Sequence, residues 1–268
     1  MQAAVGSHCV DCVKASRPPV ATRVRAVNAR QHTLVTNVII ALNGLIFLWV
    51  ALGDPSTLGN GGSISKRQFE LGLDRLILQY GARYVETSRG PTILIDPDRA
   101  HEWYRLATSG FLHFGIIHLL LNMYLLYLLG QILERSLGRT RFILLYVASL
   151  LGGSAGVILM TEGSVTGGAS GAVFGLMGAA TIAMWRQGVN ILQTGVGRTL
   201  VLNLIITFAL GSSLNISIGG HLGGLVAGAA CGAVMLAPKW RPIPRWATYA
   251  TPVAVAVLAV VIAVGRVG

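Results

Sequence analysis

Charged side chains are scarce in this chain. Only 12% of its 268 residues are Asp, Glu, Lys or Arg, while 53% are hydrophobic. A typical soluble domain carries about twice that share of charge. The composition therefore argues against a soluble globular domain and indicates a membrane protein.

Cysteine is equally rare, and its three copies are Cys9, Cys12 and Cys231. Cys9 and Cys12 resemble half of a zinc ribbon, but a tetrahedral zinc site needs four ligands and no second Cys pair exists. We therefore expect no metal site, with zinc binding by these two residues as the alternative. We interpret residues 1–32 as a basic tail and Cys231 as a small packing residue.

Long apolar runs are what the sequence does contain. Most of them reach the ~20 residues that cross ~30 Å of hydrocarbon as a helix. They predict an all-α polytopic membrane protein, with a bundle of six transmembrane helices in residues 33–236, a long outer loop at 53–110 and a seventh, C-terminal transmembrane helix in 237–268. The expected helices are 33–52, 111–133, 142–160, 168–185, 199–214, 219–236 and 247–264.

The distribution of positive charge predicts the orientation. Thirteen of the 21 Lys and Arg fall in the N-terminal tail and the loops on the same side of the predicted bundle, and the short loops on the opposite side have none. Short cytoplasmic loops carry such an excess of positive charge. We therefore expect a multi-pass protein of the cell membrane with a cytoplasmic N-terminus. The net charge of +11 then indicates contact with membrane lipid and not with nucleic acid.

Two polar side chains in these apolar segments are candidates for catalysis. Ser170 lies at the outer end of the fourth segment, and His221 lies at the outer end of the sixth. Ionisable residues inside a membrane are costly and often functional. Because both helices run inward from the outer face, the two side chains are predicted at similar depth. We expect His221 to act as base for a Ser170 nucleophile in a membrane hydrolase.

Small residues explain how the two helices could approach each other. Glycines repeat at every fourth position of both segments, which permits close helix packing in lipid. Phe174 lies one turn beyond Ser170 and is predicted to stack on the His221 ring. The glycines concerned are Gly171 and Gly175 in the fourth segment and Gly220, Gly224, Gly228 and Gly232 in the sixth.

The second segment offers donors for an oxyanion. His118 and Asn122 are four residues apart and thus share one face of a helix, with His113 one turn or more earlier. The backbone amide of Ser170, at a helix N-terminus, is a further donor. No Asp or Glu accompanies Ser170 and His221, which favours a catalytic dyad. Glu134, near the inner end of this segment, is expected to pair with Arg135, Arg139 or Arg141.

The order of these motifs resembles that of the rhomboid family of intramembrane serine proteases, in its form with six helices plus one at the C-terminus. This resemblance implies that Ser170 is the nucleophile, that His221 is the general base, and that His118, Asn122 and the Ser170 amide form the oxyanion hole. The motifs are Glu102-Trp103-Tyr104-Arg105, Phe111-Leu112-His113, His118 to Asn122, Gly168-Ala169-Ser170-Gly171, and His221 with Gly224 and Gly228.

The predicted function is cleavage of transmembrane proteins near the outer face of the membrane. Segments that unwind readily are the expected substrates, because an intact helix hides its carbonyl groups in hydrogen bonds. No cofactor is expected, and the sequence does not indicate an oligomeric state. A catalytically silent scaffold that binds membrane clients is the nearest alternative, although such a protein would be expected to lack Ser170 or His221. A transporter is disfavoured because no inverted repeat is visible.

Overall fold

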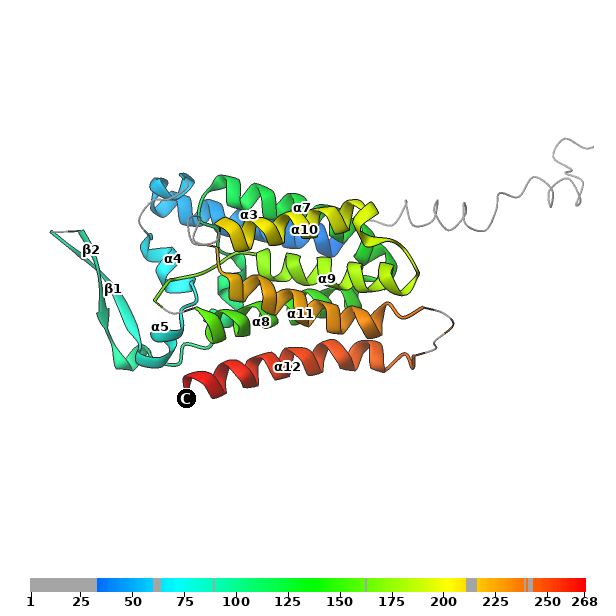
Figure 1. Ribbon diagram of the computed structural model, residues 1–268. Coiled ribbons are helices and arrows are strands. Elements are labelled where there is room, and N and C mark those ends of the chain that lie inside the picture. The colour runs from blue at the N-terminus through cyan, green and yellow to red at the C-terminus, as the bar shows by residue number, and fades with distance from the viewer. Residues whose placement is uncertain are drawn as a thin grey trace, which may run out of the picture. The chain divides into compact units, whose positions relative to one another are not determined.

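Seven helices of 16 residues or more run side by side in the computed structural model, which describes residues 33–59, 64–88, 90–161, 163–210, 216–238, 240 and 243–268. Each of the seven overlaps one predicted segment, which confirms the all-α polytopic fold class. Residues 1–32, with Cys9 and Cys12, lie outside the described part. The helices are α3 (Leu34–Gly53), α7 (Ile116–Leu137), α8 (Arg139–Met160), α9 (Ser170–Arg186), α10 (Gly195–Leu210), α11 (Ile218–Met235) and α12 (Ala247–Val267) (Figure 1).

The helices differ in length. Five of those in the described residues, namely α3, α7, α8, α11 and α12, are long and apolar enough to cross a membrane. Helix α9 has 17 residues and α10 has 16. At ~1.5 Å per residue, α9 is only about 26 Å long. Helix α9 is therefore shorter than the ~30 Å hydrocarbon layer of a typical membrane.

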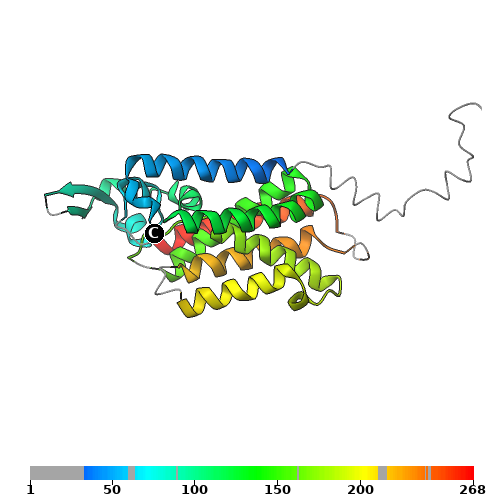
Figure 2. The same cartoon turned by 90° about the horizontal axis from the view of Figure 1, so that it is seen from above.

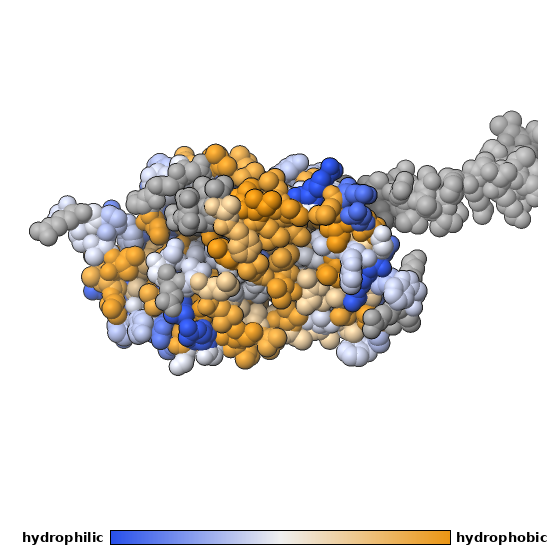
Figure 3. Space-filling model, in the orientation of Figure 1, coloured by the Kyte–Doolittle hydropathy of each residue, from blue (hydrophilic) through white to orange (hydrophobic). Residues whose placement is uncertain are grey.

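Helix α8 forms the centre of the bundle. In its most apolar stretch 72% of the residues are buried, against 22% in α12. In Figure 2, α3 and α10 run along opposite edges. Figure 3 shows hydrophobic residues over the middle of one face and hydrophilic residues toward its two ends. An apolar band between polar ends suits a bundle whose solvent is lipid.

The long connection between α3 and α7 folds into short elements. Two brief helices, α4 (Lys66–Leu71) and α5 (Arg75–Tyr80), precede an antiparallel hairpin of β1 (Ala82–Thr87) and β2 (Gly90–Ile95), which pairs Ala82 with Ile95. The sequence analysis did not predict this hairpin, although Tyr, Val and Thr in β1 and Thr and Ile in β2 favour strands. The elements that follow are η2 (Pro97–Arg99), α6 (Arg105–Thr108) and η3 (Ser109–Phe111).

A buried arginine holds this segment together. The Arg105 guanidinium is fully buried and donates to the Glu102 carboxylate at 2.6 and 2.8 Å and to the Gly72 carbonyl oxygen at 2.9 Å. Burial raises the pKa of Glu102, but hydrogen bonds from Arg105 and Arg99 outweigh that effect, so its net pKa is lowered. The Ser154 hydroxyl donates to the Leu106 carbonyl oxygen at 2.6 Å and thereby joins α6 to α8.

The pairing predicted for Glu134 is wrong. Its carboxylate, 3% exposed, accepts hydrogen bonds from the backbone N–H groups of Val35 at 2.9 Å and Thr36 at 2.8 Å, and from the Thr36 hydroxyl at 2.7 Å. The first N–H groups of a helix have no partner within it and carry the positive end of its dipole. An anion that satisfies them in an apolar environment is better placed there than beside a solvated arginine.

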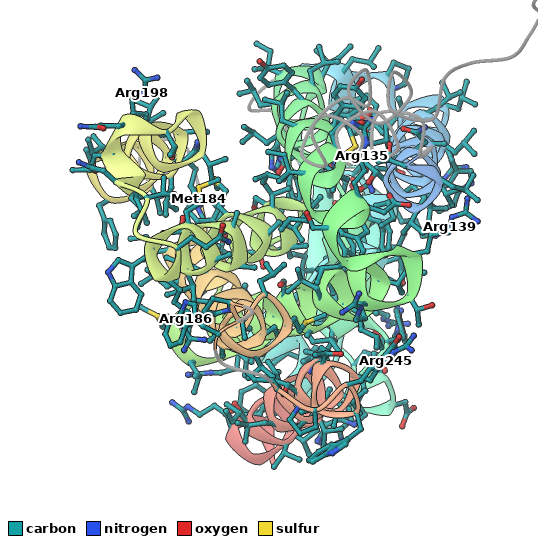
Figure 4. All side chains as sticks on the ribbon, turned by 90° about the vertical axis from the view of Figure 1, so that its right-hand side faces the viewer. Arg135, Arg139, Met184, Arg186, Arg198 and Arg245 are labelled. Carbon is teal, nitrogen blue, oxygen red and sulfur yellow. The ribbon has the colours of Figure 1, made fainter. Side chains whose placement is uncertain are left out.

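Positive side chains gather at one end of the bundle. Figure 4 looks onto that end, where the chain passes from α7 to α8, from α9 to α10 and into α12. The segment that carries the hairpin lies at the opposite end (Figure 1). The arginines at the near end include Arg135, Arg139, Arg186, Arg198 and Arg245.

Candidate active site

The loop before α9 fixes the position of Ser170. Gly168 has φ of 142°, a conformation that favours glycine, and its N–H donates to the Ser109 carbonyl oxygen at 2.9 Å. Farther back, Thr166 forms an antiparallel bridge with Leu73. The loop that leads into α9 is therefore hydrogen-bonded both to Ser109 and to Leu73. Ser170 is the first residue of the helix, where backbone N–H groups lack partners within the helix.

His221 lies in the first turn of α11, as Ser170 does in α9. Ser217 caps that helix by accepting a hydrogen bond from the Gly220 N–H at 3.1 Å, and His221 follows in the first turn. Both helices begin at the end of the bundle that carries the hairpin (Figure 1). The sequence is thus folded so that the two side chains lie at the same level.

Glycines bring α9 and α11 into backbone contact. A Cβ atom on Gly224 would lie 1.9 Å from the Gly171 carbonyl oxygen, and one on Gly228 would lie 2.0 Å from that of Gly175. No side chain fits in that space. The predicted packing of the two glycine stripes is therefore what the structure shows. The other face of α11 packs on α8 in the same manner, through Gly219 and Gly223 against Gly152 and Gly156.

This packing brings Ser170 and His221 together. The Ser170 Oγ lies 2.9 Å from Nε2 of His221, within hydrogen-bond distance. The Phe174 ring stacks on the imidazole, with centroids 4.1 Å apart and planes inclined by 17°. A hydroxyl bonded to an imidazole whose plane is held by a third group is the arrangement of an activated nucleophile.

His118 adds a donor on the other side of Ser170. Its Nδ1 accepts a hydrogen bond from the Phe114 N–H at 3.3 Å, so in the neutral ring the proton is on Nε2. A Cβ atom built on Gly168 would lie 3.0 Å from that Nε2 and 3.5 Å from the Ser170 Oγ. The N–H of His118 thus borders the space next to the hydroxyl, where a developing oxyanion would need it.

Two other predicted residues support His118 from within the bundle. The Asn122 amide donates to the His118 carbonyl oxygen at 2.9 Å, which uses one of its two N–H groups. His113 is 1% exposed and places its ring edge-on to that of His118, with centroids 5.0 Å apart. The Gln68 side chain, which the sequence analysis missed, donates to the His113 carbonyl oxygen at 3.2 Å.

A further residue at the site also escaped the sequence analysis. Thr207 of α10 is 1% exposed, and its Oγ1 lies 2.7 Å from Nδ1 of His221. Asn203 and Thr207 are spaced four residues apart and are the only polar residues between positions 200 and 210 of α10, and this spacing was the available signal. Within the described residues, no group of three or more His, Cys, Asp or Glu is arranged to hold a metal ion.

The architecture defines the class as a polytopic helical membrane protein with a serine–histidine pair between two of its helices. Residues 100–238 match the model of the rhomboid domain family. Because this match covers just over half of the chain, the chain belongs to the rhomboid family.

Named relatives extend the comparison. The chain is 33% identical over 114 residues to the rhomboid protease GluP of Bacillus subtilis, which covers 42% of this chain and 22% of that protein. It is 38% identical over 78 residues to the putative rhomboid protease YdcA of the same organism, which is 29% of this chain and 39% of that protein. These matches span between about a fifth and two fifths of the relatives' lengths.

The family also includes a relative that is named as inactive. The inactive RHOMBOID-like protein 8 of Arabidopsis thaliana is 33% identical over 84 residues, or 31% of this chain and 24% of that protein. Proteases and an inactive protein therefore both occur among the relatives of this chain. Its activity must be argued from its own residues.

Proposed function

We propose that this chain is an intramembrane serine endopeptidase in which Ser170 is the nucleophile and His221 is the general base. The observation that carries the proposal is the 2.9 Å contact between Ser170 Oγ and His221 Nε2. It joins the first turns of two helices that glycines hold in backbone contact. A scaffold that binds membrane proteins without cleaving them would not require a serine hydroxyl hydrogen-bonded to an imidazole.

The proposed reaction begins when His221 takes the proton of Ser170 and the hydroxyl oxygen attacks the scissile carbonyl carbon. The tetrahedral intermediate collapses when the resulting imidazolium protonates the leaving amine, which leaves an acyl group on Ser170. Water then gives a proton to His221 and attacks the ester carbonyl carbon, and His221 returns that proton to the Ser170 oxygen as the carboxylic acid product leaves. The cycle uses side chains of the protein alone and needs no cofactor.

The intermediate carries a negative charge that the protein must stabilise. The Nε2–H of His118 borders the space beside the Ser170 hydroxyl, and α9 begins at Ser170, so its dipole favours an anion there. We assign the oxyanion hole to His118, the Ser170 amide and Asn122. This assignment is supported by the tautomer that the Phe114 N–H imposes on His118.

The proposed topology places the N-terminus in the cytoplasm and the active site near the outer face of the cell membrane. The arginines of the short loops lie at one end of the bundle (Figure 4), and cytoplasmic loops carry such charge. Helices α9 and α11, which carry Ser170 and His221 in their first turns, begin at the opposite end. Residues 33–236 would then form the protease core, with a tail at 1–32 and an added helix in 237–268.

The proposed substrates are transmembrane segments that unwind easily. A peptide carbonyl inside an intact helix is hydrogen-bonded and shielded, so residues with poor helix propensity near the outer face favour attack. The substrate would reach the site from within the membrane. Membrane lipid is the second proposed partner, beside the substrate protein.

The test is cleavage of a single-span model substrate by the purified protein in liposomes. Ser170→Ala and His221→Ala should keep the fold and membrane insertion but lose all cleavage, and Ser170→Ala should no longer react with a fluorophosphonate probe. Ser136→Ala is the matched control, because this exposed serine at the end of α7 donates only to the Ile132 carbonyl oxygen.

Three results would be informative. Cleavage by the wild type and by the control alone supports the dyad. Cleavage by all variants points to another nucleophile and contradicts the proposal. A wild type that neither cuts helix-destabilised substrates nor reacts with the probe would favour the client-binding scaffold.

A further inference from the structure

The imidazole of His221 is bonded at both of its nitrogens. On one side Nε2 faces the Ser170 hydroxyl at 2.9 Å, and on the other Nδ1 faces the Thr207 hydroxyl at 2.7 Å. The second contact comes from α10, a helix that supplies no other residue to the proposed chemistry. Thr207 is 1% exposed, so its hydroxyl is directed into the protein and away from lipid.

The direction of the hydrogen bond at Thr207 follows from its single proton. A threonine hydroxyl has one O–H to donate and lone pairs with which to accept. The Oγ1 of Thr207 donates to the Asn203 carbonyl oxygen at 2.7 Å, one turn earlier in α10. The same oxygen therefore accepts from His221, and the imidazole proton is on Nδ1.

This tautomer is the one that a general base requires. A neutral imidazole has one protonated and one unprotonated nitrogen. With the proton on Nδ1, the lone pair of Nε2 faces the Ser170 hydroxyl and can accept its proton. The opposite tautomer would place an N–H against Ser170 and could not act as a base.

We infer that Thr207 is a positioning residue, which holds His221 in the orientation and the tautomer that activate Ser170. The inference rests on the proposed function. A hydroxyl performs here the part that a carboxylate plays in a catalytic triad, in that it accepts the Nδ1–H and steadies the ring. Because it is neutral, it avoids the cost of a charge in the membrane. Ser170 of α9, His221 of α11 and Thr207 of α10 thus form one hydrogen-bonded chain of three side chains.

Because α10 lies at the edge of the bundle, the contact between Thr207 and His221 depends on the position of that helix. The helix runs along one edge of the bundle (Figure 2), and its Leu202, Ile205 and Phe208 side chains are each 57% exposed. A displacement of α10 would therefore separate Thr207 from His221 while the α9–α11 glycine contact stays intact.

The experiment compares Thr207→Val with Thr207→Ser in the liposome assay. Valine keeps the shape and removes the acceptor, whereas serine keeps the hydroxyl. We expect Thr207→Val to lower kcat about tenfold to a hundredfold, by analogy with the loss of a group that orients a metal-binding histidine. KM should not change, because Thr207 is 1% exposed and its hydroxyl faces the His221 nitrogen that is turned away from Ser170. Thr207→Ser should restore most of the rate, and Thr199→Val, on the same helix, should be neutral.

A nitrogen-15 NMR measurement of the His221 ring tests the same inference without catalysis. The ring signals are assigned by their loss in His221→Ala, and the wild type should show a protonated Nδ1 and an unprotonated Nε2. Thr207→Val should mix the two tautomers. Failure of the proposed function would appear as an inactive wild type with this tautomer still in place. An unchanged kcat in Thr207→Val, equal losses in both Thr207 variants, or a protonated Nε2 in the wild type would overturn the inference.

Discussion

Helices α9 and α10 both contact the His221 ring, but the rest of the bundle holds them by different kinds of contact. Helix α9 meets α11 through backbone atoms, where Gly224 and Gly228 leave no room for a side chain. Helix α10 reaches the ring through one hydroxyl and exposes much of its apolar surface. Backbone packing therefore holds Ser170 and His221 within hydrogen-bond distance, whereas a single side-chain contact joins α10 to the His221 ring.

The largest effect is expected from a side chain placed in the glycine contact. Gly228→Val should abolish cleavage and lower the free energy of unfolding by about 3 kcal/mol or more, because overpacking at a tight interface forces the backbones apart. Gly44→Val on α3 is the control, since nothing lies within 4 Å of a Cβ atom there. Thermal melting and the cleavage assay measure both. A Gly228→Val protein that melts and cuts like the wild type would show that this contact does not hold the pair.

A smaller effect is expected from the ring that stacks on His221. Phe174→Leu retains a buried apolar side chain but loses a stacked pair worth about 0.5–1.5 kcal/mol. We expect kcat to fall about twofold to tenfold, less than in Thr207→Val, with Leu176→Met as a control for volume changes in α9. If Phe174→Leu lowers kcat more than Thr207→Val does, packing and not the hydrogen bond sets the ring orientation.

The smallest effect concerns the connection between α3 and α7, where ion pairs such as that of Glu102 with Arg105 replace the glycine contacts. The lowered pKa of Glu102 means that its ion pair stabilises the folded state above the unfolded pKa. This stabilisation is lost as pH falls through the folded value, which lies below the ordinary 4.5. The melting temperature should therefore fall between neutral pH and about pH 3 in the wild type, and less so in Glu102→Gln. Equal pH dependence in both proteins would show that other groups are responsible.

Much of the helical layout could be predicted from the sequence. Hydropathy locates the seven helices because each must span or enter the apolar layer, and the repeating glycines indicate which helices touch. The boundaries were less certain. The second helix begins at Ile116 and not at residue 111, because Gly115 adopts φ of 107° and the chain before it forms η3. Helix α10 begins four residues earlier than residue 199.

The rest depends on contacts between residues far apart in the chain. The roles of Ser170, His221, His118 and Asn122 were expected from their types and spacing and stay predictions. Thr207 was missed because its four-residue spacing from Asn203 marks a polar face of the helix but does not indicate which side chain will lie against it. The expected partner of Glu134 was wrong because neighbouring arginines are visible in the sequence, whereas a helix N-terminus from elsewhere in the chain is not.

The Glu134 cap also bears on how the protein is made. Val35 and Thr36 lie in the first turn of α3, and the carboxylate that accepts from their N–H groups is 99 and 98 residues away in the chain, respectively. Because α3 is synthesised before Glu134, the N–H groups of Val35 and Thr36 lack this carboxylate partner until α7 is made. The N-terminal cap of α3 is complete only when α7 packs against it. Assembly therefore couples α3 to α7, and we expect loss of Glu134 to impair the folding of these two helices during synthesis.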